Sequence, residues 1–245
     1  MVYPTASRLA FGFDLVLRRL ERTSPLTTRT QCALRALEPR AVLTEPGRTL
    51  LPDALGAVAL VLDGWACHRA GSADKPGEIY AFVLPGDAIG ALPGAGPSPP
   101  GAFTALTLTL SVDVAPLLVL DENGAQLYPD LVKALDGLRA RTERLLLDHL
   151  ERLGARNARG AISHLLLELY GRQAELGVTT GPRFPFPIER FCLGEAIGIT
   201  DLHLGRLLSD LVKRGHLLRG PGWLCLPRAR ELAREANYRT MLPDA

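Results

Sequence analysis

The chain has 245 residues, a hydrophobic fraction of 47% and a net charge of +2. This length suffices for a sizeable core, and we expect two domains. The apolar runs are shorter than the roughly 20 residues that span a bilayer, and the N-terminus lacks a signal-peptide layout. We therefore expect a soluble, cytoplasmic protein without a membrane partner. The net charge alone is too small to indicate a nucleic-acid partner.

Cysteine spacing and local charge further narrow the classes of protein to which the chain can belong. The four cysteines are widely separated, without the close pairs typical of zinc sites or iron–sulfur clusters, and indicate reduced thiols in the core. Residues 182–245 hold 10 Lys and Arg against 7 Asp and Glu, whereas residues 1–124 hold 10 against 12. This gradient is compatible with phosphate contact near the C-terminal end.

The N-terminal half has the pattern of a β domain. A helical stretch around residues 14–37 precedes a Gly- and Pro-rich segment, 40–121, with short apolar runs. The runs that predict strands are 58–62, 79–84 and 103–114. Turn signals such as Asp63-Gly64 separate them, and the loop at 93–101 is too rich in Pro and Gly to form one regular element.

Long helices begin near residue 127. A four-three spacing predicts a helix over 127–153, and a second helical pattern covers 162–176 after Gly154. The first stripe, which we assign to dimerisation, is Leu131, Leu135, Leu138, Thr142, Leu145 and His149. Leu146, Leu150 and Leu153 form a second apolar stripe, so one side can pack on the β domain and the other on a partner helix. An ordinary amphipathic core helix is the alternative.

Residues 188–217 carry the functional prediction. A short helix stops at Gly198, which tolerates the positive φ of a sharp turn, and Thr200 stands where the N-cap of the next helix belongs. That helix is expected to bury Leu204, Leu207, Leu208 and Leu211. Its outer side then carries Leu202, His203, Arg206, Ser209, Asp210 and Lys213. This pattern predicts a helix-turn-helix, with a helical hairpin used only for packing as the alternative.

The remaining residues extend this module. Residues 217–226 contain two short apolar runs around Gly220-Pro221-Gly222 and predict a β-hairpin wing. A last helix is expected over about 228–238. A wing beside two short helices favours DNA binding over simple packing.

These motifs resemble the family of the cyclic AMP receptor protein and the fumarate-nitrate reduction regulator, called Crp/Fnr. The resemblance covers nearly the whole chain and rests on LVLDGWACHRA (60–70), IYAFVLPGDAIG (79–90), the long helix and GITDLHLGRLLSDLVKRGHL (198–217). It implies an α+β fold with a β-roll of the cyclic-nucleotide-binding, jelly-roll type over 1–125, a dimerisation helix over 126–154, and a winged helix-turn-helix DNA-binding domain over 155–245.

The resemblance also implies base contacts. His203 and Arg206 fall where family members contact base edges, and Gly205 falls where some members have Gly. A guanidinium offers paired donors that fit O6 and N7 of guanine, which agrees with the place of Arg206. Asp201 and Leu202 depart from the Arg-Glu pair common there, so the operator of the best-known member does not transfer.

Further implied roles complete the functional prediction. Thr200, Ser209 and Lys213 fall near the DNA phosphates. The predicted function is that of a homodimeric transcription regulator that binds a roughly palindromic double-stranded operator, with RNA polymerase as a further candidate partner and an unidentified effector. The alternative is a ligand-sensing or protein-interaction module of the same fold without DNA binding.

The expected sensor domain departs from cyclic-nucleotide-binding members. By resemblance, Ala91 replaces the Glu that holds the ribose, and Ala102 and Phe103 stand where an Arg and its neighbour meet the cyclic phosphate. Without that cation we expect no binding of cyclic AMP. Cys67 and His68 are neighbours in an expected strand and point to opposite faces, so we expect a buried Cys and an exposed His rather than a metal or haem site.

An enzyme is the other alternative from a different class. The sequence contains no Ser/His/Asp or Cys/His arrangement, no phosphate-binding Gly loop and no HExxH. Asp148, His164 and Glu168 are interpreted as solvated or satisfied surface groups. We therefore predict no catalytic residues, no cofactor and no metal site.

Overall fold

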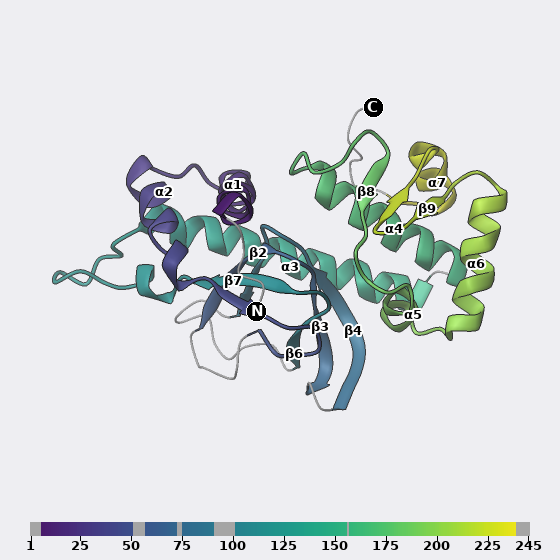
Figure 1. The fold of residues 1–245 in the computed structure, drawn as a ribbon, viewed down its shortest axis with the longest axis horizontal. Helices are drawn as coiled ribbons and strands as arrows, with labels where there is room; N and C mark the ends of the chain where they lie inside the picture. Colours follow the sequence, from purple (N-terminus) through teal and green to yellow (C-terminus); the bar gives the residue numbers. More distant parts are fainter. Residues whose placement is uncertain (1–5, 51–56, 73–74, 91–100, 156, 239–245) are drawn as a thin grey trace. The chain divides into compact units, whose positions relative to one another are not determined.

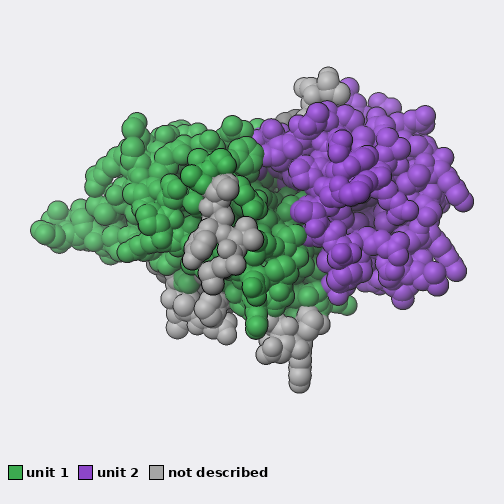
Figure 2. Space-filling model, viewed as in Figure 1, with its two compact units in different colours: residues 1–146 green, residues 147–245 purple. Residues whose placement is uncertain are grey.

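The computed structural model describes residues 6–50, 57–72, 75–90, 101–155 and 157–238. The chain divides into two compact units, residues 1–146 (unit 1) and 147–245 (unit 2), shown in green and purple in Figure 2. The division falls inside the longest helix, α3 (Pro129–Ala155). Among the described residues, no helix is both long and apolar enough to cross a membrane.

Unit 1 is a β-roll with helices at both ends of its sequence (Figure 1). Its strands are β1 (Val42–Thr44), β2 (Val58–Asp63), β3 (Ala66–Ser72), β4 (Lys75–Val83), β5 (Ala88–Gly90), β6 (Ala102–Ala105) and β7 (Thr109–Asp113). They form two antiparallel sheets, ordered β1-β7-β2-β5 and β4-β3-β6. The helical elements are α1 (Ala6–Glu21), α2 (Thr28–Arg35), η1 (Glu38–Arg40), η2 (Ala115–Leu117) and the first part of α3.

Strand β2 lies at the centre of unit 1 and is covered on both faces. Leu60 and its alternate neighbours join a cluster with α1 and α3, whereas Val61 faces a second cluster formed with the other sheet. This alternation is the period of two that a strand imposes. Helix α1 lies so close to β2 that a Cβ at Gly12 would stand 2.7 Å from the carbonyl oxygen of Leu62.

The residues assigned to dimerisation differ in their burial. Leu131, Leu135 and Leu138 are 0%, 2% and 4% exposed and belong to the core that α3 shares with α1 and β2. Their assignment to a subunit interface is therefore wrong: the β-roll of the same chain already covers them. Thr142 is exposed, Leu145 is half-buried and His149 is buried.

Unit 2 contains the last turns of α3 and a small helical domain with one sheet. Its further elements are α4 (Ala158–Ala174), β8 (Arg183–Pro185), α5 (Phe191–Ile197), α6 (Asp201–Lys213), β9 (Leu218–Gly220), β10 (Trp223–Cys225) and α7 (Ala229–Glu235). The three strands form an antiparallel sheet in the order β8-β10-β9. The sequence predicted the β9–β10 hairpin but not β8, the third strand of this sheet.

A buried ionic network joins the end of α3 to α4 inside unit 2. Glu168 forms ion pairs with Arg152 and with Arg172, and Nη1 of Arg152 lies 3.3 Å from Nδ1 of His164. These four residues are at most 5% exposed. Glu168 and His164 are thus not the surface groups that the sequence suggested.

The network also fixes the charge of Glu168. Burial by itself would raise the pKa of this carboxyl group, but the charges of Arg152 and Arg172 outweigh desolvation and hold the pKa below its ordinary value. Glu168 is therefore ionised between two guanidinium groups, in the geometry that a buried charge requires.

Candidate nucleic-acid interface

Helices α5 and α6 meet through a tight glycine turn. Gly198 ends α5 in the left-handed conformation with φ 69°, and the amide of Ile199 donates to the carbonyl oxygen of Gly194 at 3.0 Å. A Cβ at Gly194 would stand 2.9 Å from the carbonyl oxygen of Ile199. Only glycine fits these two positions without strain, so the local sequence dictates the angle at which α6 leaves the turn.

Helix α6 begins where the sequence predicted. The hydroxyl oxygen of Thr200, its N-cap, accepts a hydrogen bond from the backbone N–H of His203 at 3.3 Å. Asp201 occupies the first turn, near the positive end of the helix dipole. The cap therefore fixes the register in which the following side chains face outward.

The inner face of α6 holds the helix against unit 2. Leu204, Leu208 and Leu211 are buried, as expected, whereas Leu207 is only half-buried. Leu207 was predicted to be fully buried, but it lies at the edge of the apolar stripe. On the opposite side, Leu202 is 68% exposed.

A surface groove of about 570 Å³ runs along the outer side of α6. Its lining residues are Arg190, Asp201, Leu202, Gly205, Arg206, Ser209, Asp210 and Lys213. Six of the eight residues predicted to bind DNA thus surround one feature of unit 2. The other two do not line it: Thr200 caps the helix, and His203 is exposed beside the groove.

The acidic residues of the groove are paired with arginines. Nη2 of Arg190 lies 2.8 Å from Oδ2 of Asp201, and Oδ2 of Asp210 lies 3.0 Å from both Arg214 and Arg159. These pairs compensate carboxylates that would otherwise repel a polyanion. Arg190 was not predicted from the sequence, because it precedes α5 and only the fold brings it to α6.

Three outward side chains of α6 carry no such partner. Arg206, Lys213 and the ring of His203 are exposed, and none forms an ion pair or side-chain hydrogen bond with another described residue. A free guanidinium and a free ammonium beside compensated carboxylates leave the groove with a positive excess. Such a surface suits phosphate and base-edge acceptors.

The wing lies in the same unit and carries further cations. Gly222 has φ +72° in the turn between β9 and β10, and a Cβ at Gly220 would stand 2.4 Å from the ring of Trp223. The guanidinium of Arg183 covers the same ring, 4.1 Å from its centroid. Arg219 is exposed on β9. The three-stranded sheet thus carries two cationic side chains, Arg183 on β8 and Arg219 on β9.

Unit 1 differs from the expectation at His68, which lies on β3. This side chain is 5% exposed, because β3 pairs with strands on both sides and the ring stacks on Phe103 with centroids 4.6 Å apart. The prediction of an exposed His was wrong. Ala102 and Phe103 belong to β6, whereas Ala91 and residues 93–100 of the predicted loop lie outside the described residues.

Comparison with solved structures defines the class of fold. FixK2 from Bradyrhizobium japonicum is 24% identical over 79% of this chain and 95% of its own, with a TM-score of 0.64. A transcriptional regulator of the CRP/FNR family from Thermus thermophilus is 19% identical over 82% of this chain and 100% of its own, with a TM-score of 0.57. A CooA variant from Carboxydothermus hydrogenoformans is 18% identical over 80% of this chain and 87% of its own, with a TM-score of 0.61.

No protein-family model and no curated protein matches the sequence. The structural similarity therefore identifies the fold: the chain has the architecture of CRP/FNR transcriptional regulators, with a β-roll followed by a winged helix-turn-helix. The fold class predicted from the sequence, and with it the resemblance to that family at the level of the fold, is confirmed.

Proposed function

We propose that the chain is a cytoplasmic transcription regulator of the Crp/Fnr type that binds a specific DNA sequence through α6. One observation carries the proposal: the groove along α6 combines free basic side chains with acidic residues that are already paired. A hairpin of helices used only for packing would not require a capped helix with an exposed cationic face. The fold shared with known transcriptional regulators supports the same function.

The groove suggests which residues read bases and which bind the backbone. Arg206 is exposed near the middle of α6, where a guanidinium can donate both N–H groups to a guanine. His203 lies one turn earlier and is assigned to a base edge or a phosphate. Lys213, Ser209 and Thr200 are assigned to phosphates, which fix the register of the helix on the duplex.

Homodimerisation belongs to the proposal, through a different face of α3 from the one first assigned. Leu147 and Leu150 are each 63% exposed, and Leu153 is 46% exposed. These residues recur every three positions, so they lie on neighbouring parts of one helix surface. A second copy is the natural occupant for a regulator with two-fold symmetric half-sites, and RNA polymerase is a further partner to test.

The β-roll is proposed to lack cyclic AMP binding. Ala102 and Phe103 offer no cation where family members bind the cyclic phosphate, and the ring of Phe103 is already stacked on His68. Calorimetric titration of the full chain with cyclic AMP should give no heat of binding at micromolar concentrations. Micromolar affinity would contradict this part of the proposal.

Selection of bound fragments tests DNA reading most broadly. The purified chain is incubated with fragmented genomic DNA, and bound fragments are sequenced after several rounds. We expect enrichment of a roughly palindromic motif, with half-sites about one helical turn apart. Binding without any enriched motif, or no binding at low salt, would favour the alternative, a sensing or interaction module of the same fold that does not regulate specific genes.

A further inference from the structure

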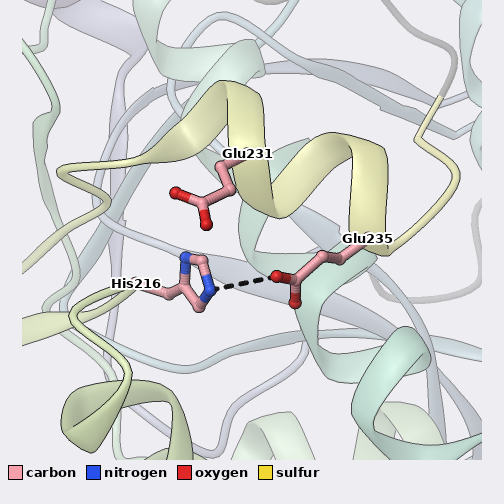
Figure 3. A group of neighbouring side chains, drawn as sticks. All are labelled: His216, Glu231 and Glu235. Atoms are coloured by element: carbon pink, nitrogen blue, oxygen red, sulfur yellow. Dashed lines mark ion pairs between the residues drawn. The ribbon is translucent and has the colours of Figure 1, made fainter.

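A second group of polar side chains in unit 2 is not used by the proposed DNA contact. His216 follows the end of α6, and Glu231 and Glu235 lie one helical turn apart on α7. One ring nitrogen of His216 and one carboxylate oxygen of each Glu lie within 4.8 Å of one another, as Figure 3 shows. These three residues are called the His216 cluster.

The histidine of the cluster is held rigidly. Its side chain is 3% exposed, and its backbone N–H donates to the carbonyl oxygen of Leu211 in the last turns of α6 at 2.9 Å. The next residue, Leu217, is fully buried. The end of α6 therefore fixes the backbone from which the buried imidazole projects.

The two ring nitrogens have different surroundings. Nε2 lies 3.4 Å from Oε1 of Glu235, whereas Nδ1 is buried and has no hydrogen-bond partner within the part of the chain that the structure describes. In Figure 3 the ring lies between the two carboxylates, with Nε2 toward Glu235 and the other nitrogen on the side of Glu231. Because no side chain or backbone group of the described residues occupies this nitrogen, it can accept an added group.

The glutamates can adjust around a bound ion. Their side chains are 52% and 44% exposed for Glu231 and Glu235, and Glu231 pairs only loosely with the exposed Arg228 at 3.8 Å. Ligand atoms in a tetrahedral site with bonds of about 2.1 Å are roughly 3.4 Å apart. Side-chain movements of about 1 Å would therefore close the cluster around an ion, and Arg228 can swing into solvent.

We propose that the His216 cluster binds a divalent transition-metal ion, for which Zn²⁺ is the best-suited candidate. One imidazole nitrogen and two carboxylate oxygens form a mixed donor set that zinc accepts, with a water completing the coordination. Mg²⁺ and Ca²⁺ prefer oxygen ligands alone. The ion would join the segment that follows the proposed recognition helix to α7, and this proposal does not depend on DNA binding.

The ligands come from segments separated in sequence, which explains why motif spacing did not reveal them. His216 belongs to the loop before the wing, and the Glu pair is at i and i+4 on a short helix. An i, i+4 pair places both carboxylates on one helix face. Only the fold brings that face to the imidazole.

Calorimetric titration of the full-length chain tests the proposal. The protein is stripped with a chelator, dialysed and titrated with ZnCl₂, and its melting temperature is measured with and without zinc. Glu231→Gln and Glu235→Gln retain the shape of the side chains at exposed positions but remove an anionic ligand. Glu189→Gln, an exposed position in the same unit, is the matched control for the change in charge.

We expect a zinc site that raises the melting temperature of the wild type and of Glu189→Gln. Loss of a supporting group typically weakens a metal site about 10- to 100-fold, and loss of a ligand should do no less, so both cluster variants should bind at least about tenfold more weakly. Equal zinc affinity and stoichiometry in all four proteins would overturn the proposal. So would the absence of zinc binding by the wild type at micromolar concentration, since the cluster would then be a His–Glu ion pair only.

Discussion

At the scale of single residues, Glu168 is a buried acid of unit 2. Its carboxylate pairs with the buried guanidinium groups of both Arg152 and Arg172. Glu168→Gln would remove the negative charge that these two buried cations share, and breaking a buried pair typically costs about 3–5 kcal/mol. Urea unfolding followed by circular dichroism measures this loss, and the exposed Glu189→Gln should change stability by less than about 0.5 kcal/mol.

The lowered pKa of Glu168 predicts that the folded chain loses stability in acid. Because the folded state holds the pKa of Glu168 below its ordinary value of 4.5, ionisation contributes stability above that value. The contribution disappears as pH falls from 4.5 through the lower pKa of the folded state. Wild type should therefore lose stability more steeply than Glu168→Gln in this range, and parallel pH profiles would show that folding does not lower the pKa of Glu168.

The ion pair of Arg190 and Asp201 leads to a prediction about DNA binding. Both side chains are about half exposed, so Arg190→Ala should change folding stability by less than about 1 kcal/mol. It should nevertheless weaken DNA binding at low salt, because the carboxylate of Asp201 then faces phosphates uncompensated. Fluorescence anisotropy measures this effect, and the double variant Arg190→Ala/Asp201→Ala should recover part of the affinity. No recovery would mean that Arg190 itself contacts DNA.

At the scale of secondary-structure elements, we expect Gly→Ala substitutions at two glycines of the α5–α6 module to change stability in opposite directions. Gly194→Ala brings a Cβ within 2.9 Å of a backbone carbonyl and should destabilise unit 2 by about 1–3 kcal/mol. Gly205→Ala meets no atom closer than 3.7 Å and should stabilise α6 by about 0.5–1 kcal/mol. Thermal unfolding of both variants provides the test, and changes of the same sign would contradict the described crossing.

The elements also show how far the sequence predicts this fold. The long helix was predicted to within two residues at each end, and the end of α5 at Gly198 and the cap of α6 at Thr200 were predicted correctly, because caps and glycines act locally. Strands β1 and β5 were missed, since three residues carry no detectable period and form only by pairing with β7 and β2.

Burial was harder to predict than secondary structure, for a similar reason. The periodic stripe on α3 marks apolar residues but does not state what covers them, so Leu131 was assigned to a partner rather than to the core of its own chain. His68 and Glu168 were misplaced because their neighbours, Phe103 and Arg152, come from distant positions in the sequence. For the interface, the face of α6 was predictable from spacing, whereas the pairing of Asp201 with Arg190 was not.

At the scale of the whole molecule, the exposed leucines of α3 predict the oligomeric state. Leu150→Glu places a charge in the centre of the proposed subunit interface and should convert the dimer to a monomer without unfolding the chain, since Leu150 is 63% exposed. Leu120→Glu is the matched control at a position that is 58% exposed outside α3. Light scattering at micromolar concentration distinguishes the two, and a dimer that persists in Leu150→Glu would exclude this face.

A comparison of Arg206→Ala with Lys213→Ala, on a selected operator and on random duplex, tests whether α6 reads a DNA sequence. Both positions are exposed, so the fold should persist. Arg206→Ala should weaken operator binding by about 1–3 kcal/mol per half-site and leave random binding nearly unchanged. Lys213→Ala should weaken both and lower the salt slope by about one. Equal losses on both DNAs for Arg206→Ala would contradict base reading by this residue, and unchanged affinity in both variants would contradict DNA binding by α6.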